Sequence, residues 1–192
     1  MTDDPAGRCP WAASSPSMLA YHDEEWGRPC HDERTLLELL NLEGAQAGLS
    51  WSTILAKRDG YRRAFDGFDP ERVAAYGAAR VAELLGDPGI VRNRSKVLAV
   101  IGNAAAYSEL VATEGSLDRY LWDWVGGVPE VHHPLAPSEV PASSALSERV
   151  SRDLKRRGFR FVGPTIVQAW LQATGVVDDH LDGCPAKPSP AA

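Results

Sequence analysis

The chain is organised around the stretch Leu42-Glu43-Gly44-Ala45-Gln46-Ala47-Gly48-Leu49-Ser50-Trp51. This stretch ends a strongly apolar helical run, breaks at two glycines and begins a second helix with Ser50 as the expected N-cap. Between the helices lie a carboxylate, an amide, a leucine and a large aromatic side chain. A turn that only joined two helices would not need this combination, so the stretch predicts a pocket for a flat, polar ligand that can carry a positive charge.

The sequence on both sides of this turn predicts an all-α fold. Before the turn, Asp32 caps a helix whose leucines bury nearly all of one side. No run of alternating apolar residues is long enough for a sheet. We expect one domain over residues 8–186, with 1–7 and 187–192 as flexible tails. Further helices are expected over residues 51–58, 61–65, 78–85, 95–111, 117–125, 145–157 and 164–174, and another begins at Asp69-Pro70-Glu71.

The composition is that of an ordinary globular protein, with 44% hydrophobic and 24% charged residues in a chain of 192. The start of the chain is acidic, unlike a secretory signal, and no apolar run approaches the roughly 18 residues of a membrane span. Three cysteines without such a signal indicate a reducing compartment, so we expect a cytoplasmic protein with no membrane partner. The net charge of −6 argues against a large non-specific nucleic-acid surface, but six basic residues gather between Arg149 and Arg160.

Two Cys–His pairs lie near opposite ends of the chain: Cys9 with His22, and His180 with Cys184. Together they form a Cys2His2 set that suits tetrahedral zinc and leaves no open coordination position. Such a zinc ion would be structural and would join the N-terminal and C-terminal segments. The alternative is two free buried cysteines and two surface histidines, and the spacing alone leaves both open. The remaining histidines and cysteine are expected to be solvated loop residues and an inert thiol: His31, His132, His133 and Cys30.

A glycine-punctuated hairpin separates two predicted helices within Leu154-Lys155-Arg156-Arg157-Gly158-Phe159-Arg160-Phe161-Val162-Gly163-Pro164-Thr165-Ile166. Backbone N–H groups of such a hairpin, close to Gly163, can bind a DNA phosphate, and Lys155 and Arg160 would add positive charge. The alternative is an ordinary corner between two helices with a solvated basic face.

The sequence after the hairpin resembles a known superfamily. Gly175-Val176-Val177-Asp178-Asp179-His180 is similar to the Val-Asp-x-His stretch that carries the catalytic aspartate of helix-hairpin-helix DNA glycosylases, although Phe161 replaces the usual first glycine of the hairpin. More specific motifs, from about Arg8 to Cys184, resemble 3-methyladenine DNA glycosylase I, the Tag family. These motifs are Arg8-Cys9-x-Trp11, Tyr21-His22-Asp23-x-Glu25-Trp26-Gly27, the turn from Leu42 to Trp51, Arg157-Gly158-Phe159-x-Phe161-Val162-Gly163 and Asp179-His180-x3-Cys184.

This resemblance implies a helix-hairpin-helix glycosylase fold, with the motif at about 145–175 and structural Zn2+ bound by the two Cys–His pairs. It also implies a monomeric, monofunctional enzyme that flips 3-methyladenine out of double-stranded alkylated DNA and hydrolyses its N-glycosidic bond, without a lyase step. By position, Glu43 corresponds to the pocket carboxylate and Leu49 to the residue inserted into the duplex. The implied base contacts and neighbours are Tyr21, Trp51, Trp26 and Trp11. Two residues, Met18 and Ala45, depart from some relatives.

The expected chemistry follows from the charge of the substrate. Methylation at N3 gives adenine a positive charge and weakens its bond to the sugar, so a strong general acid is unnecessary. The aromatic face of Trp51 and the carboxylate of Glu43 suit such a cation. We therefore expect Glu43 to matter most, and Asp178 or Asp179 to orient His180 beside the metal.

Two other functions compete with this interpretation. One is a non-catalytic protein of the same fold that binds alkylated DNA without releasing a base. The other is a zinc-stabilised helical interaction module unrelated to DNA, which predicts no salt-dependent affinity for DNA.

Overall fold

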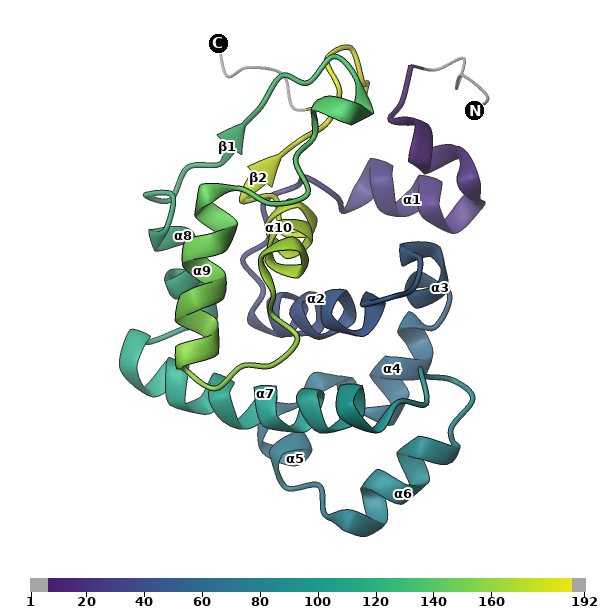
Figure 1. Cartoon of the computed structure of the whole chain (residues 1–192), viewed down its shortest axis with the longest axis vertical. Helices are drawn as coiled ribbons and strands as arrows, with labels where there is room; N and C mark the ends of the chain where they lie inside the picture. The colour runs from purple at the N-terminus through teal and green to yellow at the C-terminus, as the bar shows by residue number, and fades with distance from the viewer. Residues whose placement is uncertain (1–6, 188–192) are drawn as a thin grey trace.

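The computed structural model describes residues 7–187 and is mostly helical, as the sequence predicts (Figure 1). One pair of two-residue strands lies outside that prediction, because so short a pair produces no alternating pattern; the strands run parallel with Glu130 opposite Val177. The elements in chain order, with η for a 3-10 helix, are η1 (Pro10–Ser14), α1 (Pro16–Glu24), α2 (Glu33–Gln46), α3 (Trp51–Leu55), α4 (Arg58–Ala64), η2 (Asp66–Phe68), α5 (Pro70–Ala74), α6 (Ala78–Gly86), α7 (Arg94–Glu114), α8 (Leu117–Asp123), β1 (Glu130–Val131), η3 (Pro137–Glu139), α9 (Ala145–Arg156), α10 (Pro164–Ala173) and β2 (Val177–Asp178).

Side-chain caps begin several helices where the sequence predicts them. Asp32 accepts a backbone N–H at the start of α2, and Ser50 does the same at the start of α3. Ser144 caps α9 and forms a reciprocal capping box with Ser147. The two helices expected over 51–58 and 61–65 are α3 and α4, but the boundary between them lies near Lys57, a few residues earlier than predicted.

Helix α2 passes through the middle of the fold and packs on both sides (Figure 1). Its first half joins α8, α9 and α10 around one core, where Trp170 Nε1 donates to the carbonyl oxygen of Leu36 at 3.0 Å. Its last half joins α4 to α7 around a second core that contains Leu42 and Phe65. The leucines of α2 must be enclosed, and every residue from Leu36 to Ala45 is buried between the two cores, which accounts for the central position of the helix.

The first glycine of the turn between α2 and α3 does not break the helix, contrary to the prediction. Gly44 remains inside α2, and the chain turns at Gly48, where φ is +77°. A Cβ atom at Gly44 would lie 3.1 Å from both Cβ and the carbonyl oxygen of Phe161. Gly44 therefore permits the hairpin that follows α9 to approach the backbone of α2.

The segment between α9 and α10 is fixed by a side chain of α7 that binds its backbone, and not by strand pairing. Phe161 has φ of +54°, the left-handed conformation that glycine adopts more readily. The side chain of Asn103 on α7 holds the neighbouring residue, accepting from Arg160 N–H at 2.8 Å and donating to the Arg160 carbonyl oxygen at 3.2 Å. The same amide donates to Asn41 Oδ1 on α2 at 2.9 Å, so one side chain joins α2, α7 and the hairpin.

The N-terminal and C-terminal parts of the described chain pack together in a third core. This core contains Cys9, Tyr21, Trp26 and Cys184, and the N–H of Leu181 donates to Cys9 Sγ at 3.5 Å. This core therefore joins two segments that are more than 150 residues apart in sequence.

Residues 1–6 and 188–192, which make up most of the predicted tails, lie outside the described residues. Lys187 Nζ donates to the carbonyl oxygens of His180, at 2.9 Å, and of His132, so contacts with the fold extend to this residue. Among residues 7–187, no helix has the length and apolar character that crossing a membrane requires.

Two helical glycines give a test of this packing. A Cβ atom at Gly60 in α4 would lie 2.2 Å from the carbonyl oxygen of Gly89, whereas one at Gly102 in α7 would meet no atom within 4 Å. Gly60→Ala should lower the free energy of unfolding by about 1–3 kcal/mol through overpacking. Gly102→Ala should raise it by about 0.5–1 kcal/mol. Urea denaturation of both variants measures the difference, and equal effects would contradict the close approach of α4 to the turn at Gly89.

Candidate functional site

A cavity of about 630 Å³ opens between the N-terminal segment, the last turn of α2, the start of α3 and one side of α10. Its volume suits a small flat ligand. The five side chains that the sequence proposes for base binding and catalysis all line it: Trp11 from η1, Tyr21 from α1, Trp26 just after α1, Glu43 from α2 and Trp51 from α3. Met18, one of the two departures from some relatives, is buried and lines the same cavity.

The aromatic walls form a connected set of rings. The ring of Tyr21 lies 5.2 Å from that of Trp51, tilted by 49°. Trp11 packs edge-to-face on Trp26 at 5.0 Å, and Trp26 packs edge-to-face on His180 at 4.5 Å. The aromatic wall therefore leads directly from the cavity to the C-terminal Cys–His pair.

Glu43 is the carboxyl group of the cavity, and it is only 4% exposed. Burial raises the pKa of Glu43 to about 8, so the group is mostly protonated at neutral pH while the cavity is empty. Burial, together with the nearby Glu43, also raises the pKa of Tyr21 well above its ordinary value. The carboxyl group of Glu43 and the phenol of Tyr21 therefore add little negative charge to this part of the cavity at neutral pH.

The facing wall carries polar side chains that sequence reasoning missed. Gln168 and Gln172, one helical turn apart on α10, line the cavity together with Asp179. Asp179 is buried and accepts from Gln172 Nε2 at 2.6 Å and from His132 Nδ1 at 2.7 Å. The four-residue spacing of the two glutamines was the available signal, because it places both on one helix face.

His132 is therefore not the freely solvated loop residue that we expected. Its ring bonds to the buried Asp179, and its N–H donates to the Asp178 carbonyl oxygen at 2.9 Å. The pairing of β1 with β2, which the sequence did not predict, brings the two segments together.

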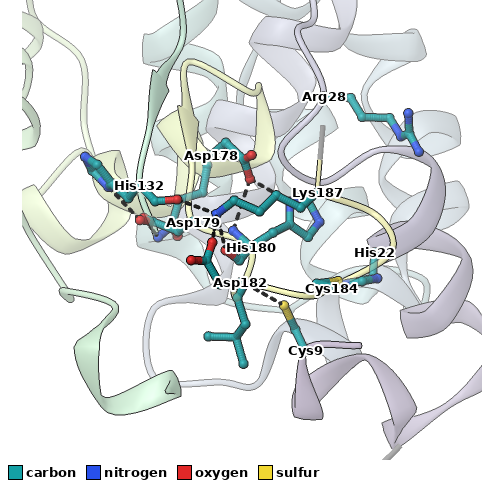
Figure 2. A network of polar contacts seen from close by, with 12 residues as sticks. Cys9, His22, Arg28, His132, Asp178, Asp179, His180, Asp182, Cys184 and Lys187 are labelled. Carbon is teal, nitrogen blue, oxygen red and sulfur yellow. Dashed lines mark hydrogen bonds and ion pairs between the residues drawn. The ribbon is translucent and has the colours of Figure 1, made fainter. Parts of the chain in front are cut away.

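Three of the four proposed metal ligands converge from the two ends of the chain (Figure 2). Cys9, His22 and Cys184 are buried, and their sulfur and nitrogen atoms lie within 4.8 Å of one another. The fourth, His180, is fully buried with its ring 4.9 Å from that of His22. Its Nε2 atom has no hydrogen-bond partner among the described residues. The alternative of two surface histidines is wrong, because both rings are completely enclosed.

A carboxylate orients each of these two histidines. His22 Nδ1 lies 2.7 Å from Asp23 Oδ1, and His180 Nδ1 lies 2.6 Å from Asp178 Oδ1. Each ring therefore keeps Nε2 for another partner, the arrangement found where imidazoles bind metals. Of the two aspartates considered for orienting His180, Asp178 makes the contact, whereas Asp179 faces the cavity.

The residues expected to contact DNA lie at the surface. Leu49 is 42% exposed in the turn between α2 and α3. Lys155 near the end of α9 and Arg160 in the following hairpin are exposed, and Gly163 is the N-cap of α10. All four positions are accessible to a large ligand approaching from outside.

Comparisons with known proteins agree with one another. A family profile described as methyladenine glycosylase matches residues 11–187. DNA-3-methyladenine glycosylase 1 of Escherichia coli strain K12 is 45% identical over 177 residues, which cover 92% of this chain and 95% of that protein. A crystal structure of 3-methyladenine DNA glycosylase I is 43% identical with a TM-score of 0.92, covering 94% of this chain and 100% of the other. A variant of 3-methyladenine DNA glycosylase I crystallised with 3-methyladenine is 38% identical with a TM-score of 0.91, covering 94% and 97%.

The burial of Glu43 predicts that stability depends on pH. The carboxyl ionises near 4.5 in the unfolded chain and at about 8 in the fold. Between these values the folded state holds a proton that the unfolded state has lost, so the free energy of unfolding falls as pH rises, by up to about 1.4 kcal/mol per pH unit. Glu43→Gln removes this contribution. The stability of Glu43→Gln relative to wild type, measured by urea denaturation, should therefore grow between about pH 5 and pH 8; a constant difference would exclude a buried neutral carboxyl.

Proposed function

The chain belongs to the methyladenine glycosylase family, and we propose that it removes 3-methyladenine from alkylated double-stranded DNA by hydrolysing the N-glycosidic bond. The observation that carries the proposal is the cavity in which Glu43, Tyr21 and Trp51 meet. A base inside a duplex cannot reach such a cavity, so it must first be flipped out. We expect the protein to act in base excision repair as a monomer in the cytoplasm.

Selection of the damaged base rests on its charge. A 3-methyladenine base attached to DNA carries a positive charge, and Trp51 and Tyr21 offer aromatic faces that attract a cation. The charge also favours ionisation of Glu43, which then pairs with the base in a site of low dielectric. Normal adenine is neutral and has no positive charge to pair with an ionised Glu43. Glu43 therefore remains protonated, and adenine binds in the cavity less favourably than the methylated base.

The cavity supports hydrolysis and not a lyase reaction. A lyase step of the Schiff-base type needs an amine nucleophile, and no lysine is among the described residues that line the cavity. The methylated base is already a good leaving group, so the protein mainly has to hold the flipped base and stabilise its charge. Glu43 is the residue we assign to this role, with Tyr21 and Trp51 as base contacts and with Trp26 and Trp11 supporting them.

DNA would be held by the turn and the hairpin. Leu49 is assigned as the wedge that fills the space of the flipped base, because it is exposed and adjoins the cavity wall formed by Gln46 and Ser50. The hairpin from Arg157 to Gly163 is assigned as a helix-hairpin-helix motif that binds a phosphate through backbone N–H groups, with Lys155 and Arg160 adding charge. The left-handed conformation of Phe161 supports this assignment, since a glycine usually supplies it.

Zinc is the metal we propose for the Cys–His cluster. Cys9, His22, His180 and Cys184 fit it because thiolate and imidazole ligands suit zinc and because the buried Nε2 of His180 otherwise has no partner. The ion would be structural, with Asp23 and Asp178 fixing the imidazole rings. It would hold η1, α1 and the residues just after α1, which together carry Trp11, Tyr21 and Trp26 of the cavity, against the C-terminal segment.

Activity is tested by the release of free 3-methyladenine from methylated duplex DNA. Wild type should release the base, and Glu43→Gln should lower the rate about 10- to 100-fold, because a hydrogen bond to a charged group contributes about 1.5–3 kcal/mol. Asp178→Asn is the companion variant and should retain more activity than Glu43→Gln. The opposite order would reassign the main role to Asp178.

The competing functions give different results in the same experiment. Tight binding of methylated duplex without release of the base would indicate a non-catalytic damage-binding protein. The absence of any salt-dependent DNA affinity would favour an interaction module instead.

The zinc proposal predicts different behaviour for two of the cysteines. Cys184→Ser should lose stoichiometric zinc, measured by elemental analysis, and should lower the midpoint of thermal unfolding, because metal binding energy contributes to folding. Cys30→Ser is the matched control, since Cys30 lies outside the cluster and its hydrogen bond from Trp122 Nε1 uses the backbone carbonyl. Full zinc content and unchanged stability in Cys184→Ser would contradict the proposal.

A further inference from the structure

A buried lysine contacts the turn that carries Leu49. Lys96 lies in the first turn of α7 and is 9% exposed. Its Nζ donates to the carbonyl oxygens of Ala45 and Ala47, each at 2.7 Å. These carbonyls belong to the last turn of α2 and to its C-cap, two residues before Leu49.

Lys96 supplies hydrogen-bond donors to backbone carbonyls at the C-terminal end of α2. The last carbonyl groups of an α-helix have no partner within the helix, and a cation placed there also complements the helix dipole. Here the Lys96 ammonium group is both the donor to these carbonyls and the cation. Burial lowers the pKa of Lys96, which is the cost of keeping an ammonium group inside the protein. Within residues 7–187, no salt bridge joins Lys96 to a carboxylate. Its ammonium group is held by hydrogen bonds to the two carbonyl oxygens.

The same helix also holds the DNA-binding hairpin. Asn103 lies two turns beyond Lys96 on α7 and contacts both the backbone of Arg160 and the side chain of Asn41. One face of α7 therefore contacts the turn with Leu49 at one end and the hairpin at the other. A rigid helix between them fixes their separation.

We propose that Lys96 is a positioning residue that holds the turn from Ala45 to Leu49 in place relative to the hairpin, so that Leu49 enters the duplex in register with the bound phosphate. The inference rests on the wedge role assigned to Leu49 under the proposed function. Lys96 touches neither the base nor the cavity. Its effect should therefore appear when a base has to be extruded from a duplex, and not when the base is already unpaired.

The test compares two substrates that carry the same lesion. Lys96→Met keeps the apolar stem and removes the donors. Excision of 3-methyladenine from methylated duplex should fall about 10-fold or more, while excision from the same methylated strand without its complement should stay within about twofold of wild type. Leu49→Ala should give the same pattern, and the double variant should lose little more than either single variant, because both act on one step. Lys96→Arg, which retains charge and donors, should recover part of the duplex activity.

Lys57→Met is the matched control. Lys57 also donates to a backbone carbonyl, that of Pro88 at 2.7 Å, but Pro88 belongs to the turn after α6 and not to the turn with Leu49, so this variant should leave both activities unchanged. If Lys96→Met does not fold, Lys96→Leu, which also lacks a donor, gives the same comparison. Binding of free 3-methyladenine, followed by tryptophan fluorescence, reports an intact cavity.

Three results would overturn the inference. These are equal losses on duplex and single strand, additive losses with Leu49→Ala, and a Leu49→Ala variant that keeps full duplex activity. Failure of the proposed function is distinguishable, because the wild-type protein would then release no base from either substrate.

Discussion

The enclosure of Glu43 is the constraint on which the rest of the structure depends. A carboxyl group that is nearly inaccessible to water is held mostly neutral by its surroundings, and this is the property on which our proposal for the selection of a cationic base rests. To enclose it, α2 must be covered on almost every side, which requires one core on each flank. The side chain of Glu38 on the same helix binds Arg58 at 2.5 Å and Arg62 at 2.8 Å, and Arg58 also binds Glu25 at the end of α1. The helix that carries the carboxyl is thereby joined to the segment that carries the aromatic wall.

Much of this arrangement could be predicted from the sequence, because the signals are local or carried by motifs. Helix caps such as Asp32 and Ser50 act within a few residues, and the cluster of leucines in α2 is enough to predict that this helix is buried. The aromatic residues and Glu43 belong to motifs whose resemblance extends over nearly the whole chain, so their meeting in one cavity was expected.

What could not be predicted depends on segments that are distant in sequence. From the sequence alone, Gly44 is expected to end a helix. The structure shows instead that Gly44 leaves room for the close approach of Phe161, which is distant in sequence. Asp178 and Asp179 are adjacent and chemically identical, and only the pairing of β1 with β2 decides which one faces His180 and which faces the cavity. His132 was misjudged for the same reason, since its partner lies 47 residues away.

The contact between the Cys9 and Cys184 segments affects the order in which parts of the chain fold. The two residues are 175 positions apart, so their contact closes a loop of nearly the whole chain, and its entropic cost falls late in folding. During synthesis, the second core around α2 can assemble while Cys184 is still absent, because its buried residues all lie between Leu42 and Ala104 and because proteins fold progressively from the N-terminus. The side of the cavity that contains Gln168, Gln172 and Asp179 is then still missing. The newly made chain therefore has a packed core before it has a complete cavity, and the cavity is completed only when the end of the chain has joined its beginning.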